Sequence, residues 1–88
     1  MIFYTLNLND AKENLSLLIK DLRKKNKLSQ SELAEKLNVS RITIQNMEAA
    51  NNITIDNFLK VLQYFHLLEK FNSLLKDEIE NTQIKSLY

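Results

Sequence analysis

The amino-acid sequence predicts an all-α protein built from five helices. Apolar residues recur at positions i, i+3, i+4 and i+7 in several segments, which is the pattern of an amphipathic helix. Residues that cap helix starts precede four of these segments, and no alternating segment is long enough to predict a strand. A chain of 88 residues forms one small domain.

The first two expected helices each follow a capping pair. The first covers residues 11–25 and starts at Asp10 and Glu13. Its apolar stripe consists of Leu15, Leu18, Ile19 and Leu22. The second helix starts at the capping box of Ser29 and Glu32 and ends near residue 38. Its apolar face consists of Leu33, Ala34 and Leu37.

The remaining helices are predicted from the same features, namely capping residues and apolar stripes. Ser40 caps a third helix that turns Ile44 and Met47 inward. Thr54 caps a fourth helix. Its stripe consists of Ile55, Phe58, Leu59, Leu62 and Phe65. A shorter fifth stripe consists of Leu68, Phe71, Leu74 and Leu75.

Two terminal segments and the turns complete the expected organisation. Residues 1–10 form either a short strand or an arm that packs on the helices, residues 11–76 form the domain, and residues 77–88 form a polar tail that is frayed or depends on a partner. The chain has no glycine, so asparagine, which tolerates the left-handed conformation, is expected in the turns. The candidates are Asn26, Asn38, Asn51 and Asn52.

The composition argues against several classes of function. With no cysteine and one histidine, His66, the chain lacks the residues for a disulfide, a thiolate metal site or a histidine cluster. No carboxylate pair or glycine-rich phosphate loop accompanies His66, so we expect no catalytic residues, no metal, no cofactor and no small-molecule ligand. The apolar stretches are short and interrupted by charge, so we expect a cytoplasmic protein without a membrane span or signal peptide.

The charges are unevenly distributed although the net charge is only +1. Residues 20–41 hold seven basic residues against three acids, and the sign reverses after residue 61. The basic residues are Lys20, Arg23, Lys24, Lys25, Lys27, Lys36 and Arg41. Such a segment is either a solvated helix flank or a nucleic-acid-binding surface, and the spacing of the apolar residues has to distinguish the two.

That spacing predicts a helix-turn-helix over residues 30–48. The small Ala34 allows the third helix to approach the second, while Val39, Ile44 and Met47 point into the core. In this motif the later of the two helices, here the expected third helix of the chain, enters the major groove of DNA. Residues one helical step away from the core positions then face outward. These are Ile42, Gln45, Asn46 and Ala49, with Arg41 and Thr43 on the flanks.

The outward side chains suit contacts with DNA bases. Arg41 has the guanidinium that pairs with guanine, Gln45 the amide that pairs with adenine, and Ile42 an apolar side chain for the thymine methyl group. Glu48 is expected to be a structural acceptor at the end of the third helix, since phosphates would repel its carboxylate. The expected base contacts are Ser40, Arg41, Ile42, Thr43 and Gln45. The expected phosphate contacts are Lys27, Ser29, Gln30, Asn46, Asn51 and Asn52.

The segment SQSELAEKLNVSRITIQNME, residues 29–48, resembles the Cro/C1-type (XRE) family of helix-turn-helix proteins. The resemblance extends over residues 15–75 and implies a five-helix, lambda-repressor-like DNA-binding domain. It also implies that Gln30 contacts a phosphate and that the Ser40 hydroxyl reaches a base or phosphate. The chain departs from the family at Asn38 and after Glu48, where glycine is usual, and this leaves the shape of the loop after Glu48 open.

Residues 51–75 resemble, more narrowly, the ending of HipB-like antitoxins. This resemblance implies a homodimer that represses its own operon at an inverted repeat and binds a HipA-type kinase toxin or its split counterpart. The dimer interface would consist of Phe71, Leu74 and Leu75; alternatively, these residues complete the core of the monomer. Two other functions remain open, namely a phage or plasmid-type repressor without a toxin and a protein-interaction module that does not read DNA.

Overall fold

The computed structural model describes residues 5–86, with side chains described as far as residue 83. It confirms the all-α prediction: the described residues form five helices and no strand. The helices are α1 (Leu8–Lys25), α2 (Gln30–Leu37), α3 (Arg41–Glu48), α4 (Ile55–Tyr64) and α5 (Leu68–Ser86).

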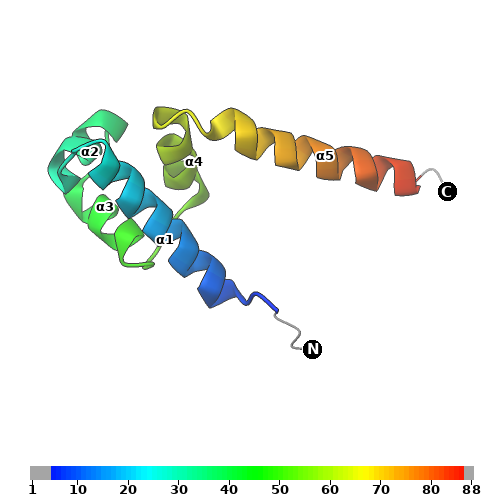
Figure 1. The fold of residues 1–88 in the computed structure, drawn as a ribbon, viewed down its shortest axis with the longest axis horizontal. Coiled ribbons are helices and arrows are strands. Elements are labelled where there is room, and N and C mark those ends of the chain that lie inside the picture. The colour runs from blue at the N-terminus through cyan, green and yellow to red at the C-terminus, as the bar shows by residue number, and fades with distance from the viewer. Residues whose placement is uncertain (1–4, 87–88) are drawn as a thin grey trace.

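Helices α1 to α4 gather into one body, and α5 runs away from it along the longest axis of the molecule (Figure 1). The molecule measures 50 × 32 × 22 Å as a result of this projection. The α2–turn–α3 unit lies at the end of the body remote from the tip of α5 (Figure 1). The far half of α5 therefore contributes little to the core.

The core lies between the first four helices. Its buried apolar residues are Ile19, Leu33, Ala34, Leu37, Ile44, Met47, Phe58, Val61 and Leu62. Val39 packs partly buried against this cluster, as expected. One buried polar contact joins α1 to α3, because the Ser16 hydroxyl donates to the carbonyl oxygen of Met47 at 2.7 Å. The packing predicted for α2 and α3 is confirmed.

Three of the predicted helix caps are confirmed. The side chains of Ser29, Ser40 and Thr54 each accept a hydrogen bond from the backbone N–H three residues later. The predicted start of the first helix is wrong, because Asn7 is the N-cap and forms a capping box with Asp10. The capping pair therefore lies three residues earlier than expected. Residues 8–10 of the proposed arm are helical, and residues 1–4, with Ile2 and Tyr4, lie outside the described part.

Some positions assigned to the apolar stripes are exposed. Leu18 on α1 and Ile55 on α4 face solvent, whereas the fully buried Val61 was not predicted. The stripe of α5 ends early as well: Phe71 is partly buried, but Leu74 and Leu75 are exposed. In the described residues of the polar tail expected over residues 77–88, α5 continues to residue 86; whether the tail frays or depends on a partner stays a prediction.

Non-glycine residues take the left-handed conformation at five described positions, namely Lys27, Asn38, Ala50, Asn52 and His66. Asn38 and Asn52 confirm two of the four asparagine predictions. Asn26 has a φ of −90° and Asn51 is not left-handed, since the adjacent Lys27 and Ala50 take that conformation instead. A β-carbon in this region is sterically unfavourable, and glycine is not subject to this penalty.

Replacing Ala50 by glycine is therefore expected to raise the free energy of unfolding by about 1 kcal/mol. Ala50 has a φ of 58°, whereas its neighbour Ala49 has a φ of −93°. Ala49→Gly is the matched control and is expected to lower stability by about 0.5–1 kcal/mol, because it only adds freedom to the unfolded chain. Urea denaturation of both variants measures the difference; a destabilised Ala50→Gly protein would contradict the turn geometry.

Candidate nucleic-acid interface

Helix α3 separates an inward from an outward face, as the helix-turn-helix prediction requires. Ile44 and Met47 are completely buried. Arg41, Ile42 and Gln45 are exposed on the same helix, and the Ile42 side chain keeps 66% of its surface in solvent. An exposed row of a cation, an apolar group and an amide on one short helix is what base-edge contacts need.

The hydroxyl groups of Ser40 and Thr43, at the start of α3, form a hydrogen bond with each other. Ser40 Oγ accepts the backbone N–H of Thr43 at 3.1 Å, and the Ser40 and Thr43 hydroxyls lie 2.8 Å apart in a hydrogen bond. Ser40 is exposed and Thr43 is half-buried. These hydrogen bonds fix the orientation of both side chains at the N-terminus of α3. This is the end of α3 that is predicted to enter the major groove.

The six residues predicted to contact phosphate do not form one cluster on one helix. Ser29 and Gln30 are at the start of α2, Lys27 is in the turn before it, Asn46 is half-buried on α3, and residues 51 and 52 are exposed in the following loop. Ser29 is already engaged in the capping box with Glu32. The start of α2 offers backbone N–H groups that suit a phosphate oxygen.

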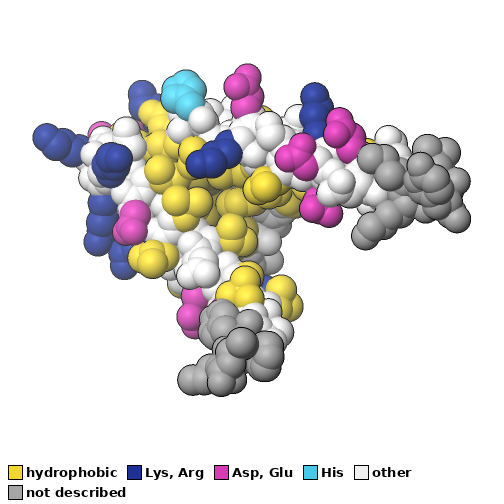
Figure 2. Space-filling view, turned by 45° about the vertical axis from the view of Figure 1, so that its right-hand side comes forward, with side chains coloured by type: hydrophobic (Ala, Val, Ile, Leu, Met, Phe, Trp, Pro, Cys, Tyr) yellow, Lys and Arg dark blue, Asp and Glu magenta, His cyan; other side chains and the backbone are white. Residues whose placement is uncertain are grey.

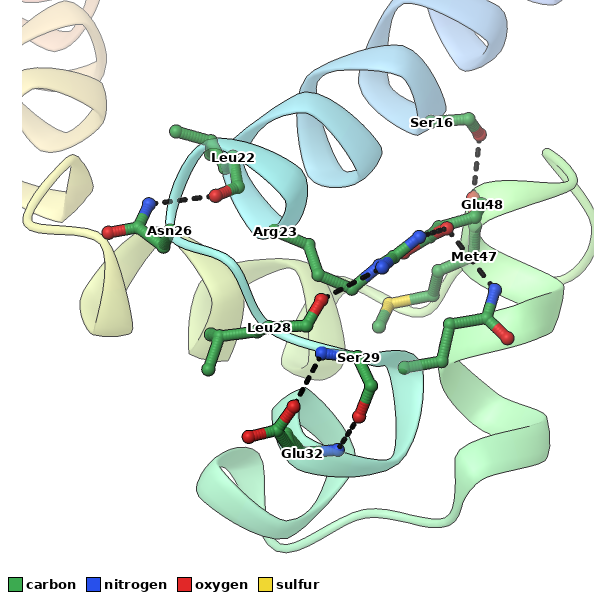
Figure 3. A network of polar contacts seen from close by, with 10 residues as sticks. Ser16, Leu22, Arg23, Asn26, Leu28, Ser29, Glu32, Met47 and Glu48 are labelled. Atoms are coloured by element: carbon green, nitrogen blue, oxygen red, sulfur yellow. Dashed lines mark hydrogen bonds and ion pairs between the residues drawn. The ribbon is translucent and has the colours of Figure 1, made fainter.

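An ion pair that was not predicted ties the motif to α1. Arg23 donates from Nε to Glu48 Oε2 at 2.6 Å and from Nη2 to Glu48 Oε1 at 2.9 Å (Figure 3). Its Nη1 also donates to the carbonyl oxygen of Leu28 at 2.9 Å. The expectation that Glu48 is a structural acceptor is confirmed. Arg23, however, is a structural partner at 11% exposure rather than part of the basic surface.

Gln30 extends this network to the start of α2. Its Nε2 donates to Glu48 Oε1 at 3.3 Å, so one carboxylate joins α1, the start of α2 and the end of α3. This contact joins Gln30, a predicted phosphate contact, to the end of α3. Arg23 and Glu48 are 25 residues apart, and no local pattern in the sequence relates them.

The network keeps Glu48 ionised. Burial alone would raise the pKa of Glu48, but hydrogen bonds from Arg23 and Gln30, with the charges of Arg23 and Lys20, hold its pKa below the usual value. The hydrogen bond to Glu48 in turn raises the pKa of Arg23. Both groups are charged near neutral pH, and Arg23 compensates the negative charge of Glu48.

The remaining surface divides by charge and polarity. Apolar side chains gather in the angle between the body and α5, while acidic and some basic side chains lie along α5 (Figure 2). Among the described residues, no three His, Cys, Asp or Glu side chains lie together in a way that could hold a metal ion. No described helix is long and apolar enough to cross a membrane.

Comparison with protein families agrees with this geometry. The model of a helix-turn-helix family matches residues 19–68, more than half of the chain, and spans the end of α1, the whole motif and α4. No curated protein matches the chain significantly. The chain therefore belongs to the Cro/C1-type (XRE) helix-turn-helix family, a non-enzymatic family of DNA-binding transcriptional regulators.

Proposed function

We propose that this regulator is a sequence-specific repressor that reads an inverted-repeat operator as a homodimer. The observation that carries the proposal is the division of α3: Ile44 and Met47 are buried, while Arg41, Ile42 and Gln45 are exposed. In a helix-turn-helix the recognition helix lies in the major groove, with its first residues at the base edges. Arg41 and Ile42 are the first two residues of α3.

Each base-reading residue has a chemical role in this proposal. Arg41 pairs with guanine, Gln45 with adenine, and Ile42 contacts a thymine methyl group. Ser40 and Thr43, which share a hydrogen bond, lie at the groove edge and contact a base or phosphate from there. The proposed phosphate contacts, which set the register of the protein on DNA, are Lys27, Ser29, Gln30, Asn46, Asn51 and Asn52.

Replacing Arg41 by alanine is expected to weaken operator binding by about 1–3 kcal/mol, roughly 5- to 150-fold, with a smaller loss on scrambled DNA. Arg41 is exposed and first in its helix, so the fold should be unaffected. Fluorescence anisotropy on the DNA upstream of the gene and on scrambled DNA measures both affinities. Arg41→Lys is the matched control, since it keeps the charge without the bidentate fork. Equal losses on both DNAs would limit Arg41 to a phosphate contact.

The proposed dimer uses the part of α5 that leaves the body. Leu74, Leu75 and Ile79 are 63%, 47% and 53% exposed, respectively. Phe71, the third predicted interface residue, instead packs edge-to-face on Phe58 with ring centroids 5.8 Å apart, so it belongs largely to the protomer. Pairing through the exposed residues would remove this apolar surface from water, and two recognition helices would then read half-sites about 34 Å apart, or a multiple of that distance.

Replacing Leu75 by aspartate is expected to convert the dimer into a folded monomer. A carboxylate in an apolar contact loses its hydration, whereas the same side chain is tolerated on an exposed monomer surface. Size exclusion with light scattering at micromolar protein measures the mass, and Ser73→Asp, on the opposite face of α5, is the matched control. A wild-type protein that is monomeric at this concentration, or a Leu75→Asp dimer, would contradict the proposed interface.

The finer part of the proposal is that the repressor is a HipB-like antitoxin whose partner is a HipA-type kinase or its split counterpart. It is supported by the resemblance of residues 51–75 to such antitoxins and by the projecting, partly apolar α5. Co-purification with a kinase-like product of a neighbouring gene tests it. Failure of such a kinase to bind would leave a phage or plasmid-type repressor, and failure of the protein to bind DNA would leave an interaction module.

A further inference from the structure

We propose that Glu48 is a positioning residue for DNA binding, acting through Gln30. This inference rests on the proposed function, because it assigns a device that supports one of the proposed phosphate contacts. A carboxamide has two N–H donors, and Glu48 Oε1 accepts one of them at 3.3 Å. The other donor is left for a phosphate oxygen at the start of α2.

The positioning follows from how firmly Glu48 itself is held. Its carboxylate receives two hydrogen bonds from Arg23 and is only 5% exposed. Gln30 is half-buried at the first position of α2 and has an unbranched side chain with many rotamers. A fixed acceptor restricts those rotamers before DNA arrives, so that less conformational entropy is lost on binding.

Arg23 makes this arrangement compatible with DNA. An uncompensated carboxylate beside a phosphate would repel it, but the bidentate ion pair neutralises Glu48 and leaves only its acceptor function. A neutral amide at position 48 would therefore serve equally well, provided that its oxygen faces Gln30. This makes Glu48→Gln the conservative variant that separates the acceptor function from the charge.

The test measures how much DNA affinity Gln30→Ala removes in three proteins: the wild type, the Glu48→Gln variant and the double variant with Arg23→Met and Glu48→Met. In the wild-type protein the substitution is expected to weaken operator and scrambled DNA alike by about 5- to 10-fold, the typical effect of one hydrogen bond. In Glu48→Gln the same cost is expected, because the amide oxygen still accepts. In Arg23→Met with Glu48→Met, which replaces the ion pair by apolar side chains of similar length, the cost is expected to fall below about 2-fold.

Anisotropy provides the affinities, and urea denaturation of every variant separates DNA binding from folding. A merely structural Glu48 would change stability but would leave the cost of Gln30→Ala at about 5- to 10-fold in all backgrounds, and this result would overturn the proposal. No cost of Gln30→Ala in the wild-type protein would overturn it as well. Failure of the wild-type protein to prefer its operator would instead refute the proposed function, which the same titrations reveal first.

Discussion

Replacing Arg23 by methionine is expected to lower the free energy of unfolding by about 3–5 kcal/mol. The substitution leaves the carboxylate of Glu48 charged, 5% exposed and without its ionic partner. It also removes the hydrogen bond from Nη1 to the carbonyl oxygen of Leu28, which supports the turn between α1 and α2. Small domains are stable by only about 5–15 kcal/mol, so this loss is a large fraction of the total.

Two controls identify the cause of that loss. The double substitution Arg23→Met and Glu48→Met is expected to recover most of the stability, because neither charge remains. Lys24→Met, at the exposed neighbouring position, is expected to change stability by no more than about 0.5 kcal/mol. Urea denaturation followed by circular dichroism measures all three proteins. An Arg23→Met protein within about 1 kcal/mol of the wild type would contradict the structural role of the ion pair.

The ion pair also predicts how stability depends on pH. The pKa of Glu48 is lower in the folded chain than its usual value, so its contribution is complete above about pH 4.3 and is lost as the pH falls through the folded-state pKa. The protein without both charges should lack this component. Urea denaturation at pH 7 and at pH 3 measures this: the wild-type protein is expected to lose the contribution of Glu48 to its free energy of unfolding at the lower pH, whereas the protein with Arg23→Met and Glu48→Met has no such contribution to lose.

Replacing Ile44 by alanine is expected to cost about 2–5 kcal/mol of stability, whereas Ile42→Ala should change it by no more than about 0.5 kcal/mol. The two isoleucines are separated by one residue on α3, yet Ile44 is fully buried and Ile42 is 66% exposed. Truncating Ile44 removes buried methyl groups and leaves a cavity between α1, α2 and α3. Truncating Ile42 removes surface that is already in water.

For DNA affinity the order of the two substitutions is expected to reverse, with Ile42→Ala having the larger effect and Ile44→Ala the smaller. Ile42→Ala should weaken operator binding more than binding to scrambled DNA, because contact with a thymine methyl group is specific to sequence. Ile44→Ala should leave the affinity of the folded fraction unchanged, since its side chain faces the core. Denaturation measures the stability of each variant, and anisotropy measures the DNA affinity of each. Loss of stability in Ile42→Ala would show that α3 is rotated relative to the described structure.

Local signals explain why so much of the fold could be predicted. The caps at Ser29, Ser40 and Thr54 each bond three residues along the chain, and the inward positions Ile44 and Met47 follow from helical period alone. These interactions involve neighbours in sequence, so a sequence pattern contains them. The division of α3 into an inward and an outward face was predictable for the same reason.

The failures concern interactions that depend on tertiary structure. The partner of Arg23 is 25 residues away, so composition alone grouped this arginine with the surface cations. Leu74 and Leu75 fit a helical stripe, but the stripe alone could not show whether they cover the core or a partner; α5 leaves the body, and both side chains are exposed. Ala50 is left-handed although Asn51 was the better candidate by propensity, because the geometry of the loop decides which residue turns.

Fluorescence anisotropy of the wild-type protein with its upstream DNA and with scrambled DNA, at two salt concentrations, measures whether α3 reads a specific operator. The upstream DNA is expected to bind at least about 10³-fold more tightly, and both affinities are expected to fall steeply as salt rises. Equal affinity for the two DNAs, or no binding to either, would contradict the reading of an operator by α3.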